Sequence, residues 1–364
     1  MVTIVCPDLL QGKYLMLDGN FDIPFEERCL ELPSGFSIIW PFRNQKRKFS
    51  ATEILLDNNA LSRSVWLREI SGIIGSSIAI TPMHALSEQW LSNPDFKARG
   101  KHKIESLFVP FIKFGLKFEE NYAENLINLL KANEAAFKSQ WMIGYLYALL
   151  LYRIVSSSKG DRTAEDILLT LNEKDVPVFA GCNMLCVLAL YLKDNPQVKM
   201  IGDDKPAFSY VAGFSALHKS KKNEVEFDEH YLRNRAGDLS MWMYIPLLTQ
   251  VDYQNIGQMA VVTSDKALKK LIFRCLPPVL LQSRQMAFSF DERSFDSVHS
   301  NAILKRMEQL SGKAGRITSR SSMLYKLENL KTHVLLEADE VLIKTAEKVW
   351  EDWIVPGFYD SFVV

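Results

Sequence analysis

Three short apolar stretches have the pattern of β-strands. Residues 53–56, 78–80 and 259–263 are compact and aliphatic, and each is closed by residues that favour a turn or a helix cap. A stretch with helical periodicity follows each of them, and the first of these helices should cover residues 60–70. Because strands that alternate with helices form parallel sheets, the pattern predicts an α/β fold with a small parallel sheet flanked by helices.

From residue 93 to about residue 223 the chain is predicted to be almost wholly helical. Apolar residues recur there at intervals of three and four, most regularly over residues 118–130 and 135–152. A further helix is expected over residues 229–248, ahead of the third strand. We therefore interpret the middle of the chain as a large helical insertion into the α/β core.

The predicted elements divide the chain into four parts. They are a mixed N-terminal segment (residues 1–50), an α/β core in two pieces (51–92 and 230–275), a helical insertion (93–229) and a helical C-terminal extension (276–364). The insertion holds two strongly apolar runs, residues 141–152 and 176–192. The first is too short to span a bilayer and the second is interrupted by Pro177, so both are expected as buried core helices, and no membrane partner is expected.

Composition limits the classes of function. Of 364 residues, 48% are hydrophobic, which is ample for a packed core, and 43 basic side chains balance 43 acidic ones. A net charge of zero provides no global field to attract nucleic acid, so any such contact must use local patches. Five scattered cysteines without a signal-peptide pattern predict a cytoplasmic location, with Cys182 and Cys186 as buried thiols. No P-loop, dinucleotide-binding or nucleophile-elbow motif is present in the sequence.

Four acidic residues stand where they would meet at one edge of the sheet. Asp57 closes the first strand in ILLDNNALS, and Asp265 closes the third in AVVTSDKALKK. Glu88 lies on the helix after the second strand in IAITPMHALSEQW, and Asp238 lies on a later helix in NRAGDLSMW. Ligand sites of open α/β sheets lie at the carboxyl ends of the strands. Carboxylates gathered there would suit Mg²⁺ or Mn²⁺, which can neutralise a phosphate and activate water.

The order and local context of these motifs resemble those of the PIN-domain nucleases. The resemblance covers residues 53–92 and 230–275. It implies a PIN-like fold and a metal-dependent endoribonuclease that hydrolyses RNA and leaves a 5′-phosphate and a 3′-hydroxyl. The acids that would hold Mg²⁺ or Mn²⁺ are Asp57, Glu88, Asp238 and Asp265. The resemblance also implies that Asn59 and Thr263 orient the first and last of these acids through hydrogen bonds.

Each acid also has a structural interpretation. Short acids after strands are common helix caps, and acids on helices are usually solvated. Asp228, Glu229 and Asp252 are sequence neighbours that could replace or supplement Asp238. The second hypothesis is therefore a non-catalytic PIN-like or helical scaffold that binds a protein or RNA partner. The long segments without a counterpart in the resemblance favour it, and in a nuclease the same insertion could bind a regulatory protein.

Basic clusters and one histidine complete the candidate chemistry. The clusters that could hold a substrate backbone are residues 43–48, 97–103, 218–222 and 313–320. Most charge runs are solvated loops, so we expect one or two of the four to face substrate, and the second or third to line the path to the metal. His84 precedes Glu88 by four positions and would share its helical face. One interpretation is a metal ligand or a phosphate contact, and the other, which we favour, is a surface histidine or a hydrogen-bonding partner of a site residue.

Overall fold

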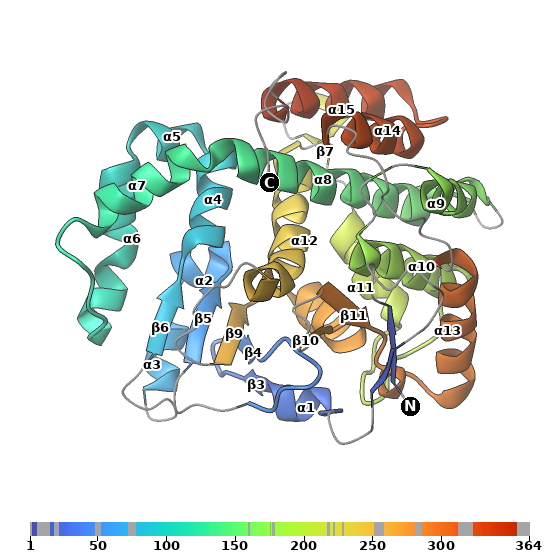
Figure 1. Cartoon of the computed structure of the whole chain (residues 1–364), viewed down its shortest axis with the longest axis horizontal. Coiled ribbons are helices and arrows are strands. Elements are labelled where there is room, and N and C mark those ends of the chain that lie inside the picture. The colour runs from blue at the N-terminus through green and yellow to red at the C-terminus, as the bar shows by residue number, and fades with distance from the viewer. Residues whose placement is uncertain are drawn as a thin grey trace.

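The computed structural model describes most of the chain. The described residues are 2–5, 15–17, 22–47, 52–71, 78–158, 161–174, 176, 179–216, 219–220, 223–227, 229–250, 258–280, 286–311 and 323–354. The fold is mixed α/β, with a five-stranded sheet and a larger body of helices (Figure 1).

The five-stranded sheet has the order β3-β4-β9-β5-β6. Its strands are β3 (Cys29–Glu31), β4 (Ser37–Ile39), β5 (Thr52–Leu56), β6 (Ile78–Thr81) and β9 (Gln258–Thr263). Strand β5 runs parallel to both β6 and β9, whereas β4 is antiparallel to β9. The predicted parallel strands are present, but the N-terminal segment supplies two further strands. The division drawn at residue 50 therefore does not separate the sheet from what precedes it.

The parallel strands β5 and β9 are buried, which is typical of strands that are covered on both faces, whereas the edge strand β6 is half-buried. All five residues of β5 are buried. The helix expected over residues 60–70 is instead two short helices, α2 (Asn58–Ser62) and α3 (Trp66–Ile70), with a turn between them. Strand β6 leads into α4 (Met83–Ser92), as predicted, and α4 continues away from the sheet (Figure 1).

The middle of the chain forms helices, as the periodicity predicts. They are α5 (Pro94–Ala98), α6 (Gly100–Phe114), α7 (Tyr122–Ala132), α8 (Glu134–Ser156), α9 (Thr163–Glu173), α10 (Ala180–Asp194) and α11 (Ala207–Ser215). The short strands β7 (Lys219–Ser220) and β8 (Asn223–Phe227) follow, and then α12 (Glu229–Gln250). Helix α8 crosses the molecule above α12, and α12 runs between the sheet and the α10 side of the molecule (Figure 1).

Two hydrophobic clusters hold these layers together. One surrounds the sheet, α4 and α6, and the other is built on α8, α10 and α12. Residues 141–152 lie within α8 and residues 180–192 of the second run lie within α10, and both segments are buried, which confirms the prediction of core helices for these residues. No helix among the described residues is long and apolar enough to cross a membrane. Cys182 and Cys186 are buried thiols, and burial raises the pKa of each.

The C-terminal extension is not wholly helical. Strands β10 (Pro278–Leu280) and β11 (Met286–Ser289) form a second sheet with β1 (Val2–Val5) and β2 (Leu15–Leu17), in the order β10-β11-β1-β2. Only after these strands come the helices α13 (Ser297–Ser311), α14 (Met323–Val334) and α15 (Glu340–Trp353). Strand pairing thus joins the N-terminal segment to residues 278–289.

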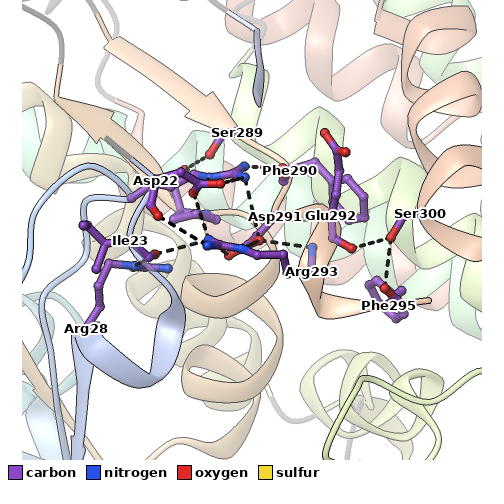
Figure 2. A network of polar contacts seen from close by, with 12 residues as sticks. Asp22, Ile23, Arg28, Ser289, Phe290, Asp291, Glu292, Arg293, Phe295 and Ser300 are labelled. Atoms are coloured by element: carbon purple, nitrogen blue, oxygen red, sulfur yellow. Dashed lines mark hydrogen bonds and ion pairs between the residues drawn. The ribbon is translucent and has the colours of Figure 1, made fainter. Parts of the chain in front are cut away.

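An ion-pair network near this junction fixes the N-terminal segment to β11 and the turn after it (Figure 2). The buried Arg43 binds both carboxylate oxygens of Asp22, at 2.7 and 3.1 Å, and donates to the carbonyl of Phe290 at 2.5 Å. Arg293 bridges Asp22 and Asp291, at 2.8 and 2.9 Å. These contacts join residues that are more than two hundred positions apart in sequence.

Candidate functional site

Asp57 and Asp265 follow the carboxyl ends of neighbouring parallel strands. Leu56 at the end of β5 is paired with Val262 of β9, and the backbone N–H of Asp57 donates to the carbonyl of Val262 at 3.3 Å. Both acids therefore emerge at the same edge of the sheet, as the sequence pattern predicts.

Both acids are also helix caps. Asp57 Oδ1 accepts a hydrogen bond from the Ala60 N–H at 2.5 Å at the start of α2. Asp265 Oδ1 accepts from the N–H groups of Ala267 and Leu268, at 2.7 and 2.9 Å. The capping interpretation of these two positions is thus correct. The capping hydrogen bonds are accepted by Oδ1 of each carboxylate, and they do not by themselves exclude a second role for the acid.

Thr263 connects the two acids. Its hydroxyl oxygen accepts from the Asp265 N–H at 3.0 Å, and the hydroxyl donates to the carboxylate of Asp57. Thr263 is 1% exposed, so this hydrogen-bonding chain is shielded from water. It lies where the resemblance implied a residue that orients the acids.

Glu88 reaches the same edge from α4. Its Oε1 accepts from Asn58 Nδ2 at 3.1 Å, and Asn58 Oδ1 in turn accepts from Gln89 Nε2 at 2.6 Å. This corrects the role that the resemblance implied for Asn59, whose side chain is exposed. The first residue of α2, directly after Asp57, faces inward toward α4, and the second turns to solvent. The orienting amide is therefore Asn58, and it acts on Glu88.

Asp238 lies in α12 and completes the group of four. Arg235, one turn earlier on the same helix, places its guanidinium between Asp238 and Asp265. Its Nη1 lies 2.8 Å from Asp238 Oδ2 and 2.9 Å from Asp265 Oδ2. We call Asp57, Glu88, Asp238 and Asp265 the carboxylate cluster. Arg235 was not predicted from the sequence, where only its three-residue spacing from Asp238 hinted at a contact.

Aromatic rings hold Arg235 in this position. Its guanidinium carbon lies 4.7 Å from the ring centroid of Tyr231 and 4.9 Å from that of Phe214. Burial alone would lower the pKa of Arg235, but the charges of Asp238 and Asp265 outweigh burial and raise it. The guanidinium therefore acts as a fixed positive charge within the carboxylate cluster.

Three members of the carboxylate cluster have raised pKa values, because their surroundings disfavour the ionised form. Burial raises the pKa of Asp57 to about 6, and the charge of Asp265 adds to the shift. Burial, followed by the charge of Asp57, raises the pKa of Glu88 to about 8. Asp238 also has a strongly raised pKa, because burial and the charges of the other three acids outweigh the attraction of Arg235. The four side chains thus interact electrostatically as one group.

His84 is not a surface residue, and it joins α4 to α12 beside the carboxylate cluster. It is buried, its Nε2 lies 3.0 Å from the Gly237 carbonyl on α12, and its ring stacks on Trp141 at 5.6 Å. Burial lowers its pKa to about 4, so the imidazole is neutral at physiological pH. A Cβ on Gly237 would lie 2.8 Å from the Trp141 ring, so glycine permits the close approach of α12.

The described residues contain no group of three or more His, Cys, Asp and Glu side chains that is arranged to hold a metal ion. Within the carboxylate cluster, the Arg235 guanidinium lies between two of the acids instead. Asp228, Asp252 and the side chain of Glu229, the suggested substitutes for Asp238, lie outside the described residues.

The basic clusters have different surroundings. Arg43 is buried in the ion-pair network, so that part of its cluster is structural. Lys97 pairs with Glu134 at 2.6 Å and lies 5.3 Å above the Trp90 ring, while Arg99 and Lys103 pair with Asp95. The side chains of residues 218–222 and 313–320 lie outside the described residues.

No family model, curated protein or solved structure matches this chain.

The stability of the metal-free protein should depend on the protonation of Glu88. Its pKa of about 8 lies above the ordinary value of 4.5, so the stabilising protonated form is fully present below pH 4.5 and is lost as pH rises through 8. Glu88→Gln imitates the protonated carboxyl. We expect it to differ from the wild type by less than about 1 kcal/mol near pH 5 and to be more stable by about 2 kcal/mol near pH 8.5, about half of what one isolated group would give because the carboxyls share protons.

Urea denaturation at the two pH values, with a chelator present, measures this difference. Glu328→Gln on α14 serves as a control because Glu328 is exposed. Equal pH dependence of Glu88→Gln and the wild type would show that Glu88 is ionised in the folded protein.

Proposed function

We propose that this protein is a metal-dependent phosphodiesterase of the PIN-like type, with RNA as its substrate. The observation that carries the proposal is the carboxylate cluster: four acids from separate elements meet at the carboxyl edge of the parallel strands, and burial together with neighbouring carboxylates raises the pKa of Asp57, Glu88 and Asp238. Gathering four acidic side chains in one place, two of them buried, opposes folding, and such groupings are typical of functional sites.

The donor set suits Mg²⁺ or Mn²⁺, which prefer carboxylate oxygens. Asp57, Glu88, Asp238 and Asp265 would hold the ion, which supplies charge neutralisation on the phosphate and a water of lowered pKa. Thr263 and Asn58 would keep the acids in position through the hydrogen bonds that they make to Asp57 and Glu88. The neutral His84 would maintain the spacing between α4 and α12 through its contact with Gly237.

Arg235 has to be displaced for an ion to reach Asp238 and Asp265. Its guanidinium and a divalent cation would compete for the same carboxylate oxygens, at 2.8 and 2.9 Å from Nη1. A metal-bound state therefore requires Arg235 to move from its position beside Tyr231 and Phe214 toward the approaching substrate.

The contact of Arg235 with Asp238 and Asp265 also favours a second candidate function. If Arg235 is the permanent counter-ion of the acids, the protein is a non-catalytic scaffold for a protein or RNA partner. The absence of a metal-holding group among the described residues is the observation in its favour. The two functions differ in whether a divalent ion binds at all.

Substitution of Arg235 tests which of these two functions is correct. For Arg235→Gln we expect Mn²⁺ to bind roughly tenfold more tightly, a gain of about 1.4 kcal/mol, because the competing cation is gone. Isothermal titration calorimetry measures the change. Arg233→Gln on the same helix is the control, because Arg233 pairs with Asp352 and should leave Mn²⁺ affinity unaltered. If neither the wild type nor Arg235→Gln binds Mn²⁺, and RNA is not cleaved, the scaffold is the correct function.

A further inference from the structure

Three side-chain amides connect Glu88 to the start of helix α5. Asn58 Nδ2 donates to Glu88 Oε1 at 3.1 Å, and Gln89 Nε2 donates to Asn58 Oδ1 at 2.6 Å. Asn93 Nδ2 in turn donates to Gln89 Oε1 at 3.1 Å. We call Asn58, Gln89 and Asn93 the amide relay. Helix α2, which begins at Asn58, lies beside α4, which carries Gln89 and ends just before Asn93 (Figure 1).

The direction of the amide relay is fixed at the end far from Glu88. A side-chain amide has one accepting and one donating end, and the hydrogen bonds around it decide which end faces a neighbour. Asn93 caps α5, and its Oδ1 accepts from two backbone N–H groups in the first turn of that helix, at 3.1 and 3.2 Å. A backbone N–H can only donate, so the oxygen of Asn93 must face α5 and its NH2 group must face Gln89. The same reasoning at the next two links turns the NH2 group of Asn58 toward Glu88.

An ionised Glu88 requires this direction. A carboxylate only accepts hydrogen bonds, so the NH2 end of Asn58 stabilises it, whereas the carbonyl end would repel it. The other oxygen of Glu88, Oε2, lies toward α12, where a Cβ on Gly237 would be 3.4 Å from it. The amide relay therefore holds one oxygen of Glu88, and the second lies beside the helix that supplies Asp238.

We propose that Asn93 and Gln89 are positioning residues for Glu88: the cap of α5 sets the direction of the amide relay, and the relay keeps Glu88 oriented as a carboxylate for a bound divalent cation. Asn93 acts through three successive hydrogen bonds. The role of the cation rests on the proposed function, whereas the direction of the amide relay does not.

Two substitutions reverse the amide relay. Asn93→Asp keeps an oxygen for the cap of α5, which aspartate provides as well as asparagine, but it has no group that can donate to Gln89. Gln89 must then turn its NH2 group toward residue 93 and its oxygen toward Asn58, which leaves the carbonyl of Asn58 facing Glu88. Gln89→Glu has the same effect one link closer to Glu88, because a carboxylate accepts with both oxygens. The control is Asn133→Asp, which adds the same charge at an exposed asparagine between α7 and α8.

Calorimetry with Mn²⁺ distinguishes reversal of the amide relay from a change of charge. Each reversing variant adds a negative charge near the carboxylate cluster, and that charge alone would attract the cation and tighten binding. Reversal has the opposite effect, so we expect Asn93→Asp and Gln89→Glu to bind Mn²⁺ roughly tenfold more weakly than the wild type. Asn133→Asp should bind Mn²⁺ as the wild type does. Affinity of Asn93→Asp that equals or exceeds that of the control would overturn the proposal.

The metal-free protein provides an independent measurement. In nuclear magnetic resonance spectra of protein with isotope-labelled asparagine, the side-chain NH2 resonances of Asn58 report its hydrogen-bond acceptor, which reversal changes from Glu88 to residue 89. We expect these resonances to shift in Asn93→Asp and to stay in place in Asn133→Asp. Unshifted resonances in Asn93→Asp would overturn the proposal. If they shift but the wild type does not bind Mn²⁺, the proposed function fails and the direction of the amide relay is confirmed.

Discussion

Asp57→Asn should abolish Mn²⁺-dependent RNA cleavage, with a loss of at least about 10³-fold, or about 4 kcal/mol of transition-state stabilisation. Asp57 directly follows strand β5, and its carboxyl interacts with Thr263, Asp265 and Glu88. Asparagine keeps the shape and the capping contact to α2, but it removes the negative charge that a cation needs. Cleavage of a labelled RNA, followed with and without Mn²⁺, measures the effect.

The fold should survive this substitution. Burial holds the pKa of Asp57 at about 6, so at pH 7.5 the wild type folds with a charge that its surroundings disfavour. Without metal, the melting temperature of Asp57→Asn should stay level or rise slightly. Asp339→Asn is the matched control, because Asp339 caps α15 through the Leu342 N–H at 2.8 Å and is exposed. A large fall in the melting temperature of Asp57→Asn alone would mean that the residue is structural.

Local sequence patterns were sufficient to predict the scaffold of the site. Strands β5 and β9 begin one residue earlier than predicted and end as predicted, because apolar runs and caps are local signals. The adjacency of Asp57 and Asp265 followed from the rule that parallel strands present their carboxyl ends at one edge. The convergence of all four acids was thus predictable in outline.

The side chains that contact the four acids could not be predicted from the sequence. Which of two consecutive asparagines faces Glu88 depends on the rotation of α2 about its axis, and the sequence does not specify that rotation. The position of Arg235 depends on Tyr231, on Phe214 from another helix and on Asp265 from β9, so it arises only in the folded chain. Short strands were expected within residues 1–50, including the apolar stretch 36–40, but the bounds of β3 and β4 and their place in the sheet were not predicted, because three residues are too few for a periodicity to appear.

Arg43 is the clearest case of a residue whose sequence context pointed away from its role. It begins a basic run that suggested a phosphate contact, yet it is buried, binds Asp22 through two hydrogen bonds and lies 3.7 Å from Asp291. Its neighbour Arg47 in the same run is exposed. A cation surrounded by acids from distant segments serves as a structural tie between the ends of the chain, whereas one in solvent can bind a ligand.

Arg43→Met should therefore destabilise the protein by about 3–5 kcal/mol, the cost of removing one partner from a buried ion pair. The methionine fills similar space, but it leaves Asp22 and Asp291 with Arg293 as their remaining partner in the network. The carbonyl of Phe290 also loses its donor. Urea denaturation, with the fall in midpoint converted through the slope, measures the change in the free energy of unfolding.

Two further variants test whether the destabilisation by Arg43→Met comes from the loss of its buried ion pairs. Arg47→Met should change stability by less than about 0.5 kcal/mol, as substitutions of exposed residues usually do. Arg43→Lys should recover only part of the loss, because an ammonium cannot reproduce the paired hydrogen bonds to both oxygens of Asp22. The contrary outcome is that Arg43→Met is as stable as Arg47→Met and binds RNA more weakly. Arg43 would then belong to the substrate surface, and the ion-pair network would contribute little to joining the N-terminal segment to β11.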